Sequence, residues 1–252
     1  MNKFYVLCLI VVIFITGCQP SETVVQTAIA QTQVAFPTAT QMPTNTPMPT
    51  STATIIPSPT PDIRLIDIDP RKLLLQTTDL PNEGKYYLPG AGWTSPLLNS
   101  EIISSWTVEK GEAYLAETGR IDGWFVSYKR GTSNVILPEE FYDNVVIYSK
   151  IEGSQIVVTK YGDRYITEAS YKEIDTPQVG DLTRAFKKSE TNSSGETRVW
   201  IKLIFSYRNV FHDVIVWGWE KEVSLDYAVS VANKLVEGLK QLPLSDTVTF
   251  TP

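Results

Sequence analysis

The chain has 252 residues, which is enough for one medium-sized domain or two small ones. Its 22 basic and 28 acidic residues give a net charge of −6, so the chain has no broad electrostatic attraction for nucleic acid or anionic lipid. With one histidine and two cysteines, it excludes Cys/His zinc sites, a disulfide framework and most histidine-based catalysis.

The first 18 residues, MNKFYVLCLIVVIFITGC, have the pattern of a secretory signal peptide. Lys3 gives a positive start, and an uncharged apolar run follows from Phe4 to Ile15. A run of this length is shorter than the roughly 20 residues of a membrane-spanning helix and is typical of a signal-peptide core. The alternative interpretation is an N-terminal anchor that stays attached.

The end of this segment resembles the lipobox of bacterial lipoproteins, because Ile15-Thr16-Gly17-Cys18 is an aliphatic residue, two small residues and a cysteine. The resemblance implies cleavage of residues 1–17 and attachment of a diacylglyceryl group to the Cys18 thiol. Acyl chains then hold the protein at the cell membrane, on its extracytoplasmic face. After the loss of Cys8, the folded domain has no thiol of its own.

The next segment, 18–62, differs in composition from everything after it. Residues 19–61 contain 11 threonines, 8 prolines and a single charged residue, Glu22. Such a composition cannot form a packed core and favours extended conformations. It predicts a disordered stalk that acts as a spacer between the membrane and a folded domain.

One domain is predicted over residues 63–242, followed by a polar tail, 243–252. Pro70 after Asp69 predicts the start of a short helix over residues 70–76. The glycines and prolines of residues 81–96 predict a loop. Residues 99–118 predict a helix that is broken near Gly111.

Strands dominate the second half of the domain. Alternating or β-branched residues predict strands at 121–130, 145–148 and 182–187, and a hairpin of 197–208 and 211–219 that turns at Arg208-Asn209. Residues 151–162 are compatible with a strand or a helix. A long amphipathic helix begins after Ser224 and ends near Leu242-Pro243. This order predicts an α+β fold, in which helices pack on one face of a mainly antiparallel sheet.

Several short segments carry a resemblance to known domains: Leu73-Leu74-Leu75, Asp79-Leu80-Pro81, residues 119–124, Val179-Gly180-Asp181, the turn Arg208-Asn209-Val210 and the closing helix. Through these segments, which extend over most of 70–240, the chain resembles exported α+β domains of bacterial lipoproteins and of the sensor regions of membrane Ser/Thr kinases. The fold that this implies resembles the PsbP/Mog1-like sandwich. The resemblance implies a sensing or ligand-binding role and no catalytic residues.

No candidate catalytic group stands out, and neither a metal nor a cofactor is predicted. His212 and Asp213 are adjacent in a strand, so their side chains point to opposite faces, and His212 is predicted to lie at the surface or at a sheet edge. Asp67 and Asp69 alternate as in a metal-binding loop, but Pro70 follows and no array of ligands continues. Glu139, Glu140 and Asp143 are predicted in a solvated turn or at a helix start, and Asp181 is predicted to be a turn residue.

Aromatic residues are the better candidates for a ligand site. Trp93 lies in the glycine- and proline-rich segment, and Tyr86 and Tyr87 precede it, so the three can line a platform for a ligand or carbohydrate. The alternative is that they cover the sheet or fix the loop. Trp200 is predicted to face away from the apolar row of its strand.

These patterns predict a membrane-anchored extracytoplasmic protein with a non-catalytic binding or sensing domain. Its partners are the membrane, through the lipid on Cys18, and a protein, a wall polymer or a small molecule; nucleic acid is not among them. One alternative is a carboxylate-dependent hydrolase of glycan or cell-wall material, which needs two carboxylates about 5–9 Å apart in a pocket. The other is a carrier of an apolar ligand, which needs an internal cavity.

Overall fold

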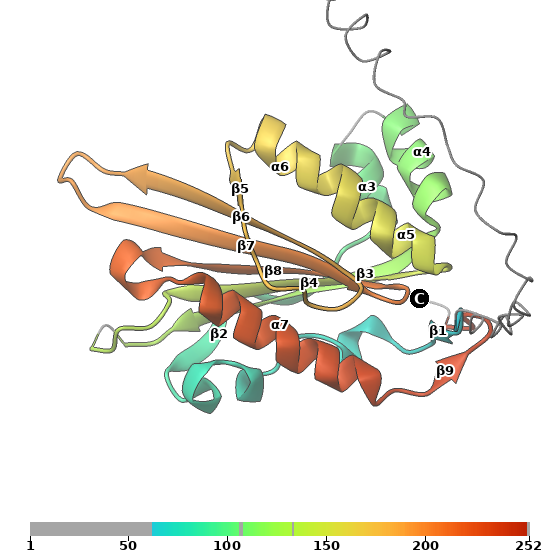
Figure 1. Ribbon diagram of the computed structural model, residues 1–252, viewed down its shortest axis with the longest axis horizontal. Coiled ribbons are helices and arrows are strands. Elements are labelled where there is room, and N and C mark those ends of the chain that lie inside the picture. The colour runs from blue at the N-terminus through green and yellow to red at the C-terminus, as the bar shows by residue number, and fades with distance from the viewer. Residues whose placement is uncertain (1–61, 106–107, 133, 251–252) are drawn as a thin grey trace, which may run out of the picture. The chain divides into compact units, whose positions relative to one another are not determined.

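A seven-stranded antiparallel sheet lies at the centre of the domain, in the order β2-β3-β4-β8-β7-β6-β5 (Figure 1). The computed structural model describes residues 62–105, 108–132 and 134–250, so the predicted signal peptide, Cys18 and the stalk up to residue 61 lie outside the described residues. The strands of the sheet are β2 (Tyr87–Pro96), β3 (Arg120–Arg130), β4 (Glu140–Tyr148), β5 (Lys172–Ile174), β6 (Leu182–Thr191), β7 (Thr197–Tyr207) and β8 (Val210–Trp219).

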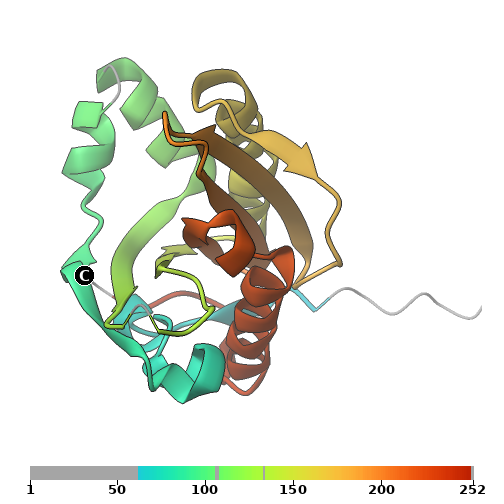
Figure 2. The same ribbon diagram turned by 90° about the vertical axis from the view of Figure 1, so that its left-hand side faces the viewer.

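Helices cover both faces of this sheet (Figure 2). The face called here the α5 face carries α3 (Asn99–Ser105), α4 (Val108–Thr118), α5 (Ile151–Ile156), the π-helical segment Val157–Tyr161 and α6 (Gly162–Glu168). The opposite α7 face carries α7 (Leu225–Lys240) and the short 3₁₀ segments Pro70–Lys72, Thr77–Asp79 and Pro81–Gly84; a fourth, Glu220–Glu222, follows β8. The α+β class and the antiparallel sheet are thus confirmed. The expectation that helices pack on one face of the sheet only was wrong, because both faces carry helices.

Two hydrophobic cores explain why both faces are covered. The central strands are apolar on both sides, so Leu203 and Val210 face α7 while Ile204 and Phe211 face α5. Each large apolar side chain that is fully buried contributes about 1.5–3 kcal/mol of transfer free energy. A single layer of helices would therefore leave one apolar row of the sheet in water.

The predicted elements of the second half are present. The strands at 121–130, 145–148 and 182–187 are confirmed as parts of β3, β4 and β6, and the hairpin turns at Arg208-Asn209, with Tyr207 opposite Val210. Helix α7 follows Ser224, and its buried stripe packs into the larger core. Residues 151–162, left open between strand and helix, are helical.

Three local predictions were wrong. Residues 87–96 are not a loop but the edge strand β2; Pro89 and the glycines are tolerated because an edge strand needs partners on one side only, and the register shifts between Pro89 and Thr94. The predicted helical segment 99–118 is divided into two helices, α3 and α4, but Gly111 lies buried inside α4 and not at the division. Of the predicted helix 70–76, only Pro70–Lys72 is helical, with Asp69 as its N-cap.

The two ends of the domain meet beside the β7–β8 turn. Strand β1 (Leu65–Ile66) pairs with β9 (Leu244–Ser245), so part of the segment predicted as a polar tail contributes a strand. The buried Asn209 side chain accepts a hydrogen bond from the Ile66 amide (2.7 Å) and donates one to the Ile66 carbonyl (3.0 Å). Arg208 donates to the carbonyl oxygens of Asp62 (3.2 Å) and Arg64 (2.7 Å). No helix within the described ranges combines the length and apolar character needed to cross a membrane.

The contact between α4 and α5 gives a first testable prediction. A Cβ atom on Gly153 would lie 1.9 Å from the backbone oxygen of Thr118, so Gly153→Ala forces the two helices apart. We expect this variant to lose about 2 kcal/mol or more of unfolding free energy. Gly238→Ala in α7 is the matched control: nothing lies within 4 Å of the new Cβ, and the better helix propensity should stabilise the protein by about 0.5–1 kcal/mol. Urea denaturation measures both, and equal effects would contradict the tight α4–α5 contact.

Candidate binding surface on the open half of the sheet

The α5 face is covered by helices along only part of its length. Figure 1 shows the described helices of this face over the end of the sheet that contains the β7–β8 turn, while β6, β7 and β8 extend beyond α6. Side chains of alternate residues on β7 and β8 share this face, so Trp200 lies on the same side as Ile204, and Trp217 and Trp219 on the same side as Phe211. We call this uncovered part of the α5 face the open half.

Three tryptophans form a ladder across the open half. Trp200 of β7 lies opposite Trp217 of β8, and their rings are stacked, with centroids 6.0 Å apart and an interplanar angle of 11°. Trp219 follows two residues later on the same face. All three side chains are partly accessible. The rings shield one another from water, as a packed helix does over the other end of this face.

Two cations complete the Trp ladder. The Arg198 guanidinium lies 5.0 Å from the centroid of the Trp217 ring and 4.6 Å from that of Trp219. The Lys188 ammonium lies 5.8 Å from the Trp200 ring. A cation over an indole face is attracted by the negative face of the ring, by about 0.5–1 kcal/mol at an exposed site. These cations therefore help to hold the three rings in their orientations.

The aromatic surface continues onto β4 and β3. The indole nitrogen of Trp217 donates to the Glu140 carboxylate (3.1 Å), and Tyr142 stacks against Phe125, with centroids 5.7 Å apart. Burial, followed by the hydrogen bond to the Glu140 carboxylate, raises the pKa of Tyr142 to about 12. The Tyr142 phenol therefore stays protonated to higher pH than a free tyrosine, and its hydroxyl donates to the Glu140 carboxylate.

A buried polar cluster separates the open half from the helix-covered half. The Lys202 ammonium lies 2.9 Å and 2.6 Å from the two carboxylate oxygens of Asp213. Tyr165 of α6 donates to the same carboxylate (3.2 Å), as does Asn144 (3.4 Å). Burial and the Asp213 charge raise the pKa of Tyr165 above its usual range. The cluster fixes α6 at the edge of the open half.

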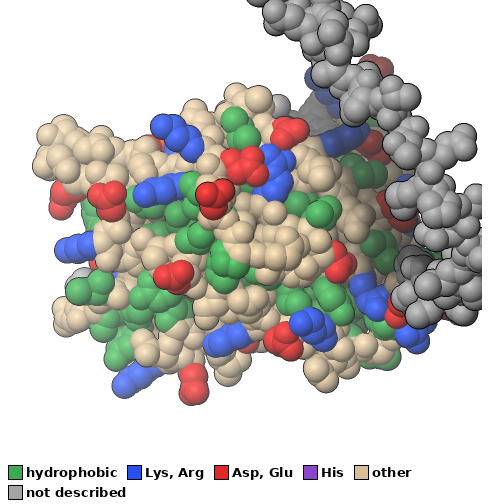
Figure 3. Space-filling model, in the orientation of Figure 1, with side chains coloured by type: hydrophobic (Ala, Val, Ile, Leu, Met, Phe, Trp, Pro, Cys, Tyr) green, Lys and Arg blue, Asp and Glu red, His purple; other side chains and the backbone are tan. Residues whose placement is uncertain are grey.

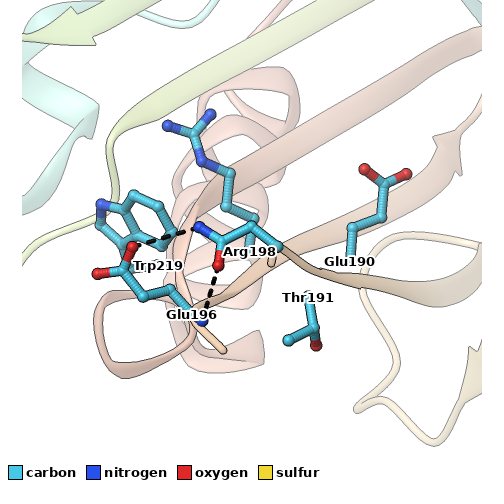
Figure 4. Close-up of a pocket in the computed structure, with 6 residues that line it drawn as sticks. Glu190, Thr191, Glu196, Arg198 and Trp219 are labelled. Atoms are coloured by element: carbon cyan, nitrogen blue, oxygen red, sulfur yellow. Dashed lines mark hydrogen bonds between the residues drawn. The ribbon is translucent and has the colours of Figure 1, made fainter. Parts of the chain in front are cut away.

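Two hollows meet at Trp219, at the outer end of the ladder. The smaller, about 170 Å³, is lined by Trp219 and by Glu190, Thr191, Asn192, Glu196 and Arg198 (Figure 4). The larger, about 300 Å³, is lined by Trp219 and by Glu196, Thr197, Glu220 and Lys221. Asn192 donates to the Glu196 carboxylate (3.2 Å), which fixes the turn between β6 and β7. In Figure 3, basic and acidic side chains are mixed over the visible face.

The three aromatic residues proposed from the sequence lie in different surroundings. Tyr87 is buried in the larger core, donates to the Pro138 carbonyl (3.0 Å) and packs edge-on against Phe141. Tyr86 is partly buried against the same core. Trp93, in contrast, is 63% exposed. Of the three, only Trp93 has a mostly exposed side chain.

The prediction for His212 was wrong, because the residue is fully buried. Its Nδ1 lies 2.9 Å from the carboxylate of Asp143, which also accepts from the Leu75 amide (3.0 Å), and its ring stacks on Phe205. Asp143 is fully buried as well, so it is a core residue of β4 and not part of a solvated turn. This pair joins the sheet to the segment after the first 3₁₀ turn, away from solvent.

The other acidic residues mostly have structural partners. Glu140 is also buried in β4, contrary to the prediction of a turn. Asp69 caps the first 3₁₀ turn, and Asp67 accepts from the Phe250 amide (2.9 Å). Asp181 accepts from the Arg208 amide (2.6 Å), as expected of a turn residue. Within the described ranges, no three His, Cys, Asp or Glu side chains are grouped to hold a metal ion.

Sequence reasoning missed Trp217 and Trp219, although a signal for them was present. A tight turn at Arg208-Asn209 fixes the register of the hairpin, and this register places Trp200 opposite Trp217 and Arg198 opposite Trp219. The alternation that places Trp200 on the face opposite the apolar row of its strand therefore places Trp217, Trp219 and Arg198 on that same face. The ladder follows from the sequence once the hairpin is closed.

Comparison with known proteins adds a structural likeness at low sequence identity. No protein-family model matches the chain, and no curated protein matches its sequence. The structure is similar to the crystal structure of the extracellular domain of PknH from Mycobacterium tuberculosis, with a TM-score of 0.45 and 14% sequence identity. The similarity covers 69% of this chain and 98% of that one.

Proposed function

We propose that this chain is a lipid-anchored extracytoplasmic protein, and that its domain binds a ligand without converting it, through the open half of the sheet. The lipobox-like end of the signal peptide and the Thr/Pro-rich stalk support the anchor and the spacer.

The Trp ladder is the observation that carries the binding role. Aromatic rings and arginine are the side chains that most often dominate binding energy at recognition surfaces. Here three accessible indoles and Arg198 lie together, held in place by stacking and by cation–π contacts. Because these side chains are already held in place, little binding free energy would be lost by immobilising them when a ligand binds.

The anchor is tested on the full chain in its own membranes. We expect intact-mass analysis to find residues 1–17 removed and a lipid mass on Cys18. The Cys18→Ser chain should lack this mass and be released by an aqueous wash, because only acyl chains of about 0.8 kcal/mol per buried methylene hold the protein at the bilayer. An unmodified thiol at Cys18 in membrane-purified protein would contradict the anchor, and so would equal release of both forms.

The binding role is tested with the mature chain in mild detergent and with washed cell-envelope fragments as the probe. We expect co-sedimentation of the wild type, and binding about tenfold weaker for Trp200→Ala/Trp217→Ala, equivalent to about 1.4 kcal/mol. Trp93→Ala is the matched control, since it removes an exposed tryptophan outside the ladder. Loss of binding in Trp93→Ala alone would move the site to the segment predicted from the sequence. Absence of binding by the wild type would contradict the proposed function.

A further inference from the structure

We propose that Trp219 and the side chains around it bind neutral glycan chains, with a pyranose ring as the recognised unit. This inference rests on the proposed function and names the ligand class of the same surface. Trp219, Arg198 and Glu190 form one cross-strand row at the ends of β8, β7 and β6 (Figure 4). The row lines the smaller hollow beside the turn at 192–195, and Trp219 also lines the larger hollow.

The lining has the chemistry that a sugar ring requires. A pyranose has a face of C–H groups and a rim of hydroxyl groups. The Trp219 indole offers an apolar surface to the C–H face. This indole lines both hollows, whereas Arg198 lines only the smaller one. Carboxylates, an amide and hydroxyls surround it and match the rim as acceptors and donors; they belong to Glu190, Glu196, Glu220, Asn192, Thr191 and Thr197.

The local charge favours a neutral ligand. Three carboxylates line the hollows against two cations, Arg198 and Lys221, and Glu190 also pairs with Lys188 (2.8 Å), so the lining has no excess of positive charge to attract an anionic ligand. The Arg198 guanidinium also lies against two indole rings and 3.7 Å from the Glu139 carboxylate. A purely apolar ligand would bury these charges without partners, at a cost in desolvation. A hydroxyl-rich neutral molecule avoids this cost and requires no excess of positive charge.

The ladder indicates a polymer rather than a single sugar. Trp217 lies two residues before Trp219, a separation of about 6.7 Å along a strand. Trp200 continues the row onto β7, with its ring centroid 6.0 Å from that of Trp217. The aromatic surface thus extends well beyond one ring, and the larger hollow of about 300 Å³ is of the size typical of ligand sites, roughly 300–1,000 Å³.

The experiment uses the mature chain in mild detergent and a panel of purified polysaccharides. The neutral probes are cellulose, chitin, starch and mannan, and the anionic probes are polygalacturonate and heparin. We expect retention by at least one neutral polysaccharide that persists at high salt. Trp219→Ala should weaken it about tenfold, as expected for the loss of a central aromatic contact. Glu196→Gln, which keeps the size of an exposed side chain, should weaken it by a smaller factor, and Trp93→Ala should leave it unchanged.

Three outcomes would overturn the glycan assignment. These are failure to bind any neutral probe, binding to anionic probes alone that disappears with salt, and equal binding by wild type, Trp219→Ala and Glu196→Gln. Circular dichroism and thermal unfolding confirm that each variant is folded, and Glu196→Gln serves if Trp219→Ala is not. If binding to envelope fragments still depended on Trp200 and Trp217, the proposed binding function would stand with another ligand. Failure of the glycan assignment is therefore distinguishable from failure of the proposed function.

Discussion

Asp143→Ala is expected to lower the free energy of unfolding by about 3–5 kcal/mol, one of the two largest effects of any single substitution considered. The Asp143 carboxylate is fully buried and accepts from the Leu75 amide and from Nδ1 of His212. Nε2 of His212 already has no hydrogen-bond partner in the described part of the chain. Removing the carboxylate leaves the Leu75 amide and both ring nitrogens of His212 buried without hydrogen-bond partners among the described residues.

Equilibrium unfolding in urea measures this loss. Asp163→Ala is the control, because its side chain is 72% exposed and its ion pair with Arg184 (3.0 Å) lies at the surface. We expect less than about 1 kcal/mol for that variant. If Asp143→Ala were no more destabilising than Asp163→Ala, the carboxylate would not be the buried acceptor that joins β4 to Leu75.

Lys202→Met is expected to destabilise the domain to a similar extent, by about 3–5 kcal/mol. The ammonium of Lys202 neutralises the Asp213 carboxylate, and the side chains of both residues are less than a tenth exposed. Without it, a buried negative charge keeps only the hydroxyl of Tyr165 and the amide of Asn144 as partners. The measurement is again the free energy of unfolding in urea.

The double variant Lys202→Met/Asp213→Leu separates loss of charge balance from loss of packing. Replacing both partners removes the uncompensated charge, so this variant should regain about 2 kcal/mol or more relative to Lys202→Met alone. A double variant that is as unstable as the sum of the two single ones would contradict the coupling of these residues. It would also show that the cost lies in packing against Tyr165.

The strongly patterned parts of the fold were predictable from the sequence. Alternation over 197–208 predicted β7, and the helical stripe after Ser224 predicted α7. Both patterns are visible in the sequence because each marks one continuous apolar face. The edge strand β2 was missed because Pro89 and Gly90 are local signals for a loop, and tertiary pairing with β3 overrides them. The sequence did not predict that helices cover both faces of the sheet, because an apolar run such as that of β8 does not indicate which helix packs on which side.

The candidate surface was predictable only in part, for a related reason. Trp200 was recognised because it interrupts an alternating strand, whereas Trp217 and Trp219 lie in a strand that is almost wholly apolar. Their role depends on register and on where the helices of the α5 face end, and both are properties of the folded chain. The proximity of Asp143 and His212, 69 residues apart, is likewise invisible in the local sequence.

The contacts between the start of the domain and the β7–β8 turn determine where a pulling force on the chain would enter the sheet. A pull on Asp62 would act first on Arg208 and then on β1, which β9 and Asn209 hold beside this turn. Trp219 lies at the far end of the same hairpin, roughly 33 Å away for ten residues of extended strand. With the proposed anchor, force from the membrane side would therefore enter at the end of the hairpin opposite the proposed ligand surface.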